Sequence, residues 1–208
     1  MKLNYLKRFL FFSVFLYFQA LFFSTPVFAL KIPSPEDFFG YKVGADYHLI
    51  NYEQAVEYWK KLDELSGKIK VFEYGKTSGG RLMVFAAVSS EDNLAKLNHY
   101  KEISKRLSLV KGLTKDEALR LSSEGKAIVW IDGGLHATEV APAQHIIQLT
   151  YDLLTDESKR TKKILDEVIA MFVLPNPDGM DLVAEWYHSH LNTPYETSPL
   201  PWLYQKYI

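Results

Sequence analysis

Cysteine is absent from all 208 residues of the sequence. The protein therefore forms no disulfide bond, and its folded state depends on a hydrophobic core and, if one binds, on a metal ion. Internal repeats and low-complexity tracts are also absent. The sequence thus gives no sign of a repeat protein or of a biased, unstructured segment.

A charge excess of either sign is also missing. Lys and Arg number 24 and Asp and Glu number 25, for a net charge of −1 at pH 7. Without the first 29 residues, which carry three basic residues and no acidic one, the balance is 21 against 25, or −4. A negative charge this mild, with no basic patch, argues against a nucleic-acid partner.

The most apolar stretch, residues 9–23, is shorter than the ~20 residues that a membrane-spanning helix needs. The residues on either side of it are typical of a secretory signal peptide. Basic residues precede it, namely Lys2, Lys7 and Arg8, and residues with small or medium side chains stand at the cleavage position, namely Val27, Phe28 and Ala29. We therefore predict a cleaved signal peptide over residues 1–29 and one domain over residues 30–208, secreted or periplasmic, with no stable membrane span after cleavage. An uncleaved anchor is the alternative. The lack of cysteine is more typical of a bacterial periplasm or medium.

Hydrophobic periodicity and turn residues predict an α/β fold. Helices are predicted at residues 52–65, 93–109, 114–123, 139–154, 158–166 and 180–188, and strands at 69–74, 82–88, 127–131 and 168–174. The first two strands most simply form a hairpin, and residues 31–50 are an irregular lead-in. Each of the last two strands is followed by a helix, which predicts a parallel α/β unit with the hairpin added at one side.

The strand predicted at 127–131 leads into the most informative residues. Its apolar, β-branched composition predicts a buried, central strand. Gly133 and Gly134 allow a sharp turn and a close approach of the backbone to a ligand. If a helix begins just before Glu139, then His136 and Glu139 lie about one turn apart and can reach one point. An imidazole nitrogen and a carboxylate oxygen suit zinc, and ligands of open α/β sheets gather at the carboxyl ends of strands.

Simpler interpretations of these residues remain open. A His-x-x-Glu pair occurs often by chance. Asp132 either orients His136 or caps the end of the strand. His188 and His190 form a His-x-His pair, a known metal arrangement, but they fall at a predicted helix end. His145, on the helix that follows the pair, is more typical of a packed or surface position.

The residues Asn-Pro-Asp-Gly at 176–179 directly follow the last predicted strand. Taken alone they predict a turn, because each of these residue types favours turns. Their position also indicates a functional site, because the carboxyl ends of parallel strands lie at the same end of a sheet. His136 and Glu139 are expected at that end.

Together these features resemble the zinc carboxypeptidase family, the carboxypeptidase A-like metallopeptidases. Gly-Leu-His-Ala-Thr-Glu at 134–139 is like the family's first zinc-binding pair, and Pro-Asn-Pro-Asp-Gly at 175–179 is like its second landmark. The turn at 74–81 is similar to a Gly-x-Ser/Thr-x-Gly-Arg turn of the family. The resemblance covers most of residues 35–208. It implies an α/β/α sandwich around a mixed, largely parallel sheet, with this chain forming about the first half of an eight-stranded sheet.

The resemblance also implies a function. His136 and Glu139 are then two ligands of one zinc ion, Zn²⁺, which activates a water molecule to hydrolyse a carboxyl-terminal peptide bond. The implied substrate is a peptide or a peptidoglycan stem peptide, and the residues that bind it stay unassigned. A zinc amidase or deacylase of the same superfamily is a close alternative.

Several parts of the family pattern are not found in the sequence. The family's third zinc ligand lies much further along than the 69 residues that follow Glu139. The general base and the substrate-binding arginines are also expected beyond Ile208, and no arginine occurs after Arg160. We therefore expect residues 30–208 to be an incomplete catalytic domain of an exported zinc metallocarboxypeptidase. If the chain is instead complete, we expect a non-catalytic or vestigial peptide-binding protein with an open strand edge and an apolar face.

Overall fold

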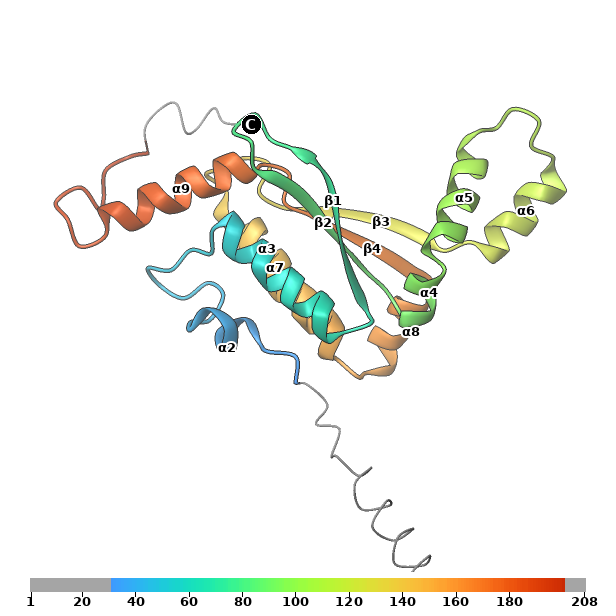
Figure 1. Ribbon diagram of the computed structural model, residues 1–208, viewed down its shortest axis with the longest axis horizontal. Helices are drawn as coiled ribbons and strands as arrows, with labels where there is room; N and C mark the ends of the chain where they lie inside the picture. The colour runs from blue at the N-terminus through green and yellow to red at the C-terminus, as the bar shows by residue number, and fades with distance from the viewer. Residues whose placement is uncertain (1–30, 201–208) are drawn as a thin grey trace, which may run out of the picture. The chain divides into compact units, whose positions relative to one another are not determined.

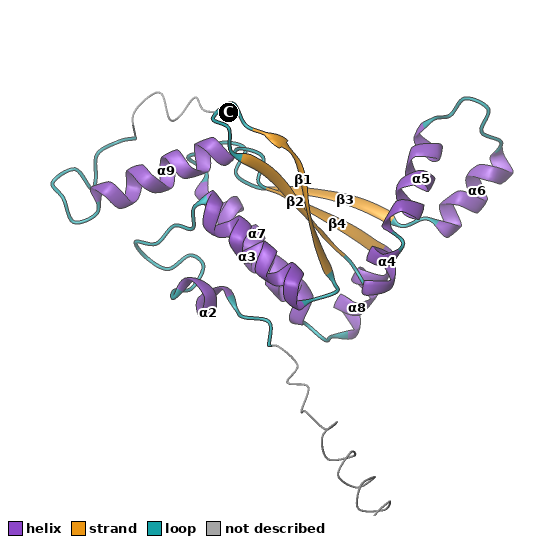
Figure 2. Cartoon of the chain, in the orientation of Figure 1, coloured by secondary structure: helices purple, strands orange, loops and turns teal. Residues whose placement is uncertain are grey.

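The computed structural model describes residues 31–200 of the chain. Their central element is a mixed four-stranded sheet (Figures 1 and 2). Its strands are β1 (Ile69–Lys76), β2 (Leu82–Val88), β3 (Ala127–Asp132) and β4 (Val168–Val173), in the order β1-β2-β4-β3. β1 pairs with β2, and β2 with β4, in antiparallel fashion, while β3 and β4 are parallel. The predicted α/β class and the hairpin at one side of a parallel unit are confirmed. β4 is the strand next to the hairpin.

Eight helices connect and cover the described strands: α2 (Pro35–Phe39), α3 (Tyr52–Leu65), α4 (Glu91–Ala95), α5 (Leu97–Ser108), α6 (Lys115–Glu124), α7 (Val140–Thr155), α8 (Lys159–Glu167) and α9 (Pro177–His190). Ser34, Asn51, Thr114 and Ser158 each cap a helix by accepting a hydrogen bond from the backbone N–H three residues later. The short helix α2 lies within the lead-in that we predicted to be irregular. None of the helices between residues 31 and 200 has the length and apolar character of a membrane span.

The main hydrophobic core lies between the sheet and the two helices α3 and α7, which pack on the same face (Figure 1). In α3, helical spacing directs Val56, Trp59 and Leu62 into this core. The indole nitrogen of Trp59 donates a hydrogen bond to the Thr150 hydroxyl of α7 at 3.2 Å. Phe172 of β4 is fully buried beneath these helices. Each such side chain contributes roughly 1.5–3 kcal/mol through its burial.

The opposite face of the sheet is less completely covered. A smaller core forms where α5 and α6 approach it, and a groove of about 570 Å³ remains between α5 and the sheet. β3 forms one edge of the four-stranded sheet, and its Ile128 and Trp130 are 41% and 55% exposed. The prediction of a buried, central strand is therefore wrong for the described chain. Composition shows that a strand suits an apolar setting, but it does not show which neighbours the strand has.

One predicted helix is divided in two. The periodicity at 93–109 predicted a single helix, whereas α4 ends before Lys96 and α5 begins after it. The side-chain amide of Asn93 holds α4 in place by donating to the carbonyl oxygens of Leu165 (2.9 Å) and Asp166 (3.0 Å). Because these partners are distant in the sequence, the helical pattern gives no sign of the break.

Candidate functional site

Two segments follow β3 and β4 at the carboxyl ends of these parallel strands. We call residues 133–139 the β3 loop and residues 175–181 the β4 segment. Parallel pairing aligns Asp132 with Val173, so both segments leave the sheet side by side. The Gly133 N–H donates to the Val173 carbonyl oxygen at 3.2 Å and joins their bases. The structure thus brings the two sequence motifs together, as the parallel strands predicted.

The β3 loop turns sharply against α7. A Cβ on Gly133 would lie 2.6 Å from the Pro142 carbonyl oxygen, so only glycine allows this approach. Gly134 has a φ of +87°, a backbone conformation that residues other than glycine rarely adopt. Behind the loop, the cavity that includes Gly134 and Glu139 in its lining measures only about 10 Å³. The inner side of the loop is therefore closely packed.

His136 and Glu139 lie in this loop directly before α7, whose start is within one residue of the prediction. A turn joins them, in which the Glu139 N–H donates to the His136 carbonyl oxygen at 3.0 Å, and α7 begins at Val140. Both side chains are exposed. Neither makes a hydrogen bond or ion pair with another of the described residues. The imidazole and the carboxylate are therefore available to a ligand.

The donor set fits zinc in part. An imidazole nitrogen and a carboxylate oxygen are both common zinc ligands, and a catalytic zinc ion takes three protein ligands. Within residues 31–200, no cluster of three or more His, Asp or Glu side chains is arranged to hold a metal. The described chain thus offers a pair of candidate ligands and not a complete site.

Asn176 connects the β4 segment to the β3 loop. Its side-chain oxygen accepts a hydrogen bond from the Gly179 N–H at 3.0 Å and caps α9. Its side-chain nitrogen donates to the Leu135 carbonyl oxygen at 3.1 Å. A Cβ on Gly179 would lie 2.7 Å from the Cβ of Ala137, so the start of α9 packs directly against the β3 loop. We predicted a turn here with a helix from Met180, but Pro177 already occupies the first helical position, which suits its fixed φ.

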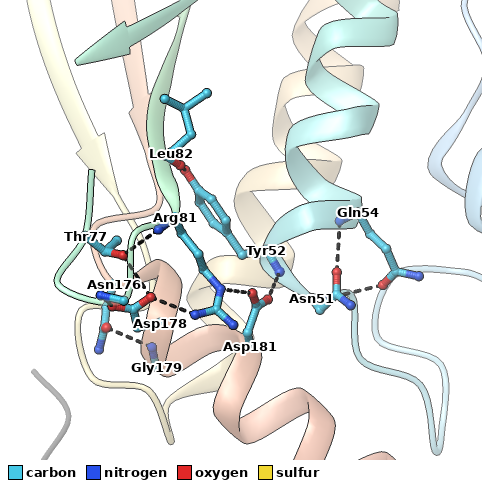
Figure 3. A network of polar contacts seen from close by, with 11 residues as sticks. Asn51, Tyr52, Gln54, Thr77, Arg81, Leu82, Asn176, Asp178, Gly179 and Asp181 are labelled. Atoms are coloured by element: carbon cyan, nitrogen blue, oxygen red, sulfur yellow. Dashed lines mark hydrogen bonds and ion pairs between the residues drawn. The ribbon is translucent and has the colours of Figure 1, made fainter. Parts of the chain in front are cut away.

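A charged network fixes the other side of α9 to the hairpin (Figure 3). Arg81, the residue directly before β2, contacts Asp178 through Nη1 at 2.9 Å and Asp181 through Nε at 2.6 Å. Asp178 also accepts hydrogen bonds from the Thr77 hydroxyl (2.9 Å) and the Gly79 N–H (3.0 Å). Asp181 accepts one from the Tyr52 N–H at 2.7 Å. Three elements, α3, the hairpin turn and α9, therefore meet at this network.

The network sets the protonation of its members. Burial raises the pKa of Asp178, but hydrogen bonds from Gly79, Thr77 and Arg81 outweigh burial and hold that pKa below its usual value. Burial lowers the pKa of Arg81, but its bonds to the two carboxylates outweigh burial and raise it. Burial also raises the pKa of Tyr52 to about 12. At neutral pH the network therefore joins the Asp178 carboxylate to the Arg81 guanidinium. The Tyr52 phenol is neutral, and it bonds to the backbone of β2 at Leu82 and Val84.

The other histidines named from the sequence have different partners. The Leu49 N–H donates to His188 Nε2 at 3.3 Å. The ring of His190 stacks on Trp186 with centroids 4.3 Å apart. His145 is exposed on α7, in the lining of a cleft of about 670 Å³. In the part of the chain that the structure describes, none of them joins the His136 and Glu139 pair in a metal cluster.

Asp132 also has another partner. Its carboxylate accepts a hydrogen bond from the Trp130 indole nitrogen at 2.7 Å. It makes no hydrogen bond to His136 among the described residues. Of the two roles left open for it, the structure therefore supports the one at the strand end.

The sequence analysis missed Asp181 and Tyr52, and it gave no role to Arg81. Two local signals were present. Asp181 lies three residues after Asp178, on the same side of a helix, and Arg81 ends a turn that already resembled a family motif. What joins them is a contact across 97 to 100 residues of sequence, which no local pattern shows.

The comparison with family models agrees with the sequence resemblance. A family model described as zinc carboxypeptidase matches residues 55–197. Among solved structures, carboxypeptidase A from Helicoverpa armigera is similar at 16% identity with a TM-score of 0.44, over 69% of this chain and 26% of that chain. The chain thus spans about a quarter of the length of that structure. No curated protein matches the sequence.

Proposed function

The chain belongs to the zinc carboxypeptidase family, and on that premise we propose that it forms part of the catalytic domain of an exported zinc metallocarboxypeptidase. In this proposal His136 and Glu139 are two ligands of one zinc ion. The observation that carries the proposal is the state of the β3 loop. Its inner side is closely packed, while the imidazole and the carboxylate are exposed and have no other polar partner among residues 31–200.

The roles of the two side chains follow from their chemistry. When bound, zinc lowers the pKa of a coordinated water molecule and polarises the carbonyl group that this water attacks. His136 offers a neutral ring nitrogen, and Glu139 offers an anionic oxygen.

A complete site needs a third protein ligand and a general base. We propose that both lie beyond Ile208, with residues 1–29 as a signal peptide and residues 30–208 as the first part of the catalytic domain. Within residues 31–200, no three His, Asp or Glu side chains are grouped to hold a metal ion. The proposed substrate is the carboxyl end of a peptide, including a peptidoglycan stem peptide, met in the periplasm or the medium.

The zinc content of the native exported protein tests the ligand assignment. We expect His136→Ala and Glu139→Ala to lose both bound zinc and carboxypeptidase activity. His145→Ala is the matched control, because His145 is also exposed but lies outside the β3 loop, and it should retain zinc. Unchanged zinc content in His136→Ala would contradict the assignment.

The intact mass of the exported protein tests the arrangement of the domain. A mass well above the 24.0 kDa of this chain supports an enzyme whose remaining ligand and base lie beyond Ile208. A mass close to that of residues 30–208 rules out the peptidase. That result would leave the peptide-binding alternative, for which binding of peptides without hydrolysis is the expected property.

A further inference from the structure

The positions of His136 and Glu139 depend on the backbone of the β3 loop. Metal-binding side chains are commonly oriented by hydrogen bonds to neighbouring groups. Here the side chains of the pair have no such partner within the described chain. Whatever fixes the loop backbone therefore also fixes the two Cα positions from which the imidazole and the carboxylate extend.

Three contacts hold that backbone from the side of β4 and α9. The Gly133 N–H is bonded to Val173, the Leu135 carbonyl oxygen is bonded to Asn176, and Ala137 packs against Gly179. The contact at Leu135 is the most direct, because this carbonyl belongs to the peptide unit that enters His136. Rotation of that peptide unit would move the imidazole.

Asn176 is itself held in one orientation. It is 8% exposed, and its oxygen is fixed by the Gly179 N–H, so its nitrogen must face Leu135. The helix that carries it is anchored in turn by Arg81, which bonds to both Asp178 and Asp181. The amide thus transmits the fixed position of α9 to the β3 loop.

We infer that Asn176 is a positioning residue of the zinc site, acting through the Leu135 carbonyl. This inference rests on the proposed function, because it takes His136 and Glu139 to be zinc ligands. The donor half of the amide does the positioning, and the acceptor half caps α9. The two halves can be separated by substitution.

Asn176→Asp separates them. Aspartate caps a helix as well as asparagine does, so the bond from Gly179 remains. It has no N–H, however, and it places a carboxylate oxygen against the Leu135 carbonyl. Asn51→Asp is the matched control, because the Asn51 side chain also caps a helix by accepting from the backbone N–H three residues later, and among the described residues it makes no hydrogen bond to the β3 loop.

The experiment measures Zn²⁺ affinity by competition with a coloured chelator, and the thermal midpoint of the metal-free protein, on the full native chain. We expect Asn176→Asp to weaken zinc binding by about 10- to 100-fold, as is typical for groups that support a metal ligand. Asn51→Asp should leave the affinity unchanged. Asn176→Asp should lower the metal-free midpoint, because it leaves the Leu135 carbonyl oxygen without its donor, but the variant should remain folded at the temperature of the zinc titration. Equal affinity in Asn176→Asp and the wild type would overturn the inference.

Two further variants guard against misfolding and separate the positioning role from the proposed function. If Asn176→Asp does not fold, Asn176→Ser serves instead, because its hydroxyl still caps the helix but is too short to reach Leu135. His136→Ala is measured in parallel. If His136→Ala also leaves the affinity unchanged, the proposed function fails. If it lowers the affinity while both Asn176 variants do not, only the positioning role fails.

Discussion

The β3 loop and the β4 segment lie next to each other, yet their polar side chains are in opposite states. In the β3 loop, His136 and Glu139 are exposed and have no polar partner among the described residues. In the β4 segment, Asn176 and Asp181 are buried and Asp178 is only partly exposed, and all three are bonded to other elements.

This difference separates two roles that the sequence motifs do not distinguish. Exposed, unpaired donors are available to a ligand and add little to the stability of the fold. Buried, bonded groups hold elements together, and their loss leaves other groups unpaired. In the proposed function, the first motif provides the metal ligands and the second supports their position, and three predictions test this division.

The largest effect is expected from Arg81→Ala. This change removes the cation shared by Asp178 and Asp181, of which Asp181 has a side chain only 3% exposed. Removing one partner of a buried ion pair typically costs about 3–5 kcal/mol, because it leaves an unpaired buried charge. Urea denaturation of the metal-free protein measures the free energy of unfolding. Arg120→Ala is the control, since its pair with Glu124 is exposed and contributes at most about 1 kcal/mol. Equal losses in the two variants would contradict a supporting role for the network.

A smaller effect is expected from Asp178→Asn, roughly 1.5–3 kcal/mol, the usual contribution of hydrogen bonds to a charged group. The effect should depend on pH. Because the folded pKa of Asp178 is lowered, its contribution is present above the ordinary carboxyl pKa of about 4 and is lost as the pH falls through the folded value. The wild type should therefore lose more stability on acidification than the variant does. Parallel curves for the two proteins would argue against the ionised carboxylate. A variant of full stability that lacks activity would instead indicate a direct catalytic role.

The smallest effect on stability is expected from His136→Ala and Glu139→Ala. Both side chains are exposed and unpaired in the described chain, so the metal-free variants should unfold within about 0.5 kcal/mol of the wild type. The same denaturation experiment measures this. A loss of 2 kcal/mol or more, on the scale of the Asp178 variant, would mean that the β3 loop is also structural.

Much of the framework could be predicted from local sequence. The four strands, the hairpin and most of the helices lie close to their predicted positions, because hydrophobic periodicity and turn chemistry act over a few residues. The meeting of the two motifs at one sheet edge also followed, because it needs only that β3 and β4 be parallel neighbours.

Other features depended on partners that are distant in the sequence. The division of one helix at Lys96 follows contacts of Asn93 with α8, and the exposure of β3 follows its place at the edge of the sheet. Local patterns carry no information on either of these.

The sequence by itself determined which groups are available: an imidazole and a carboxylate after one strand, and an Asn-Pro-Asp-Gly run after another. The tertiary structure decided how they are used. It bonded Asn176 to the Leu135 carbonyl and placed Arg81 between two carboxylates of α9. The physical reason is that residue type and spacing specify donors, acceptors and local conformation. Which donor meets which acceptor across about 40 to 100 residues depends on how the sheet and helices pack.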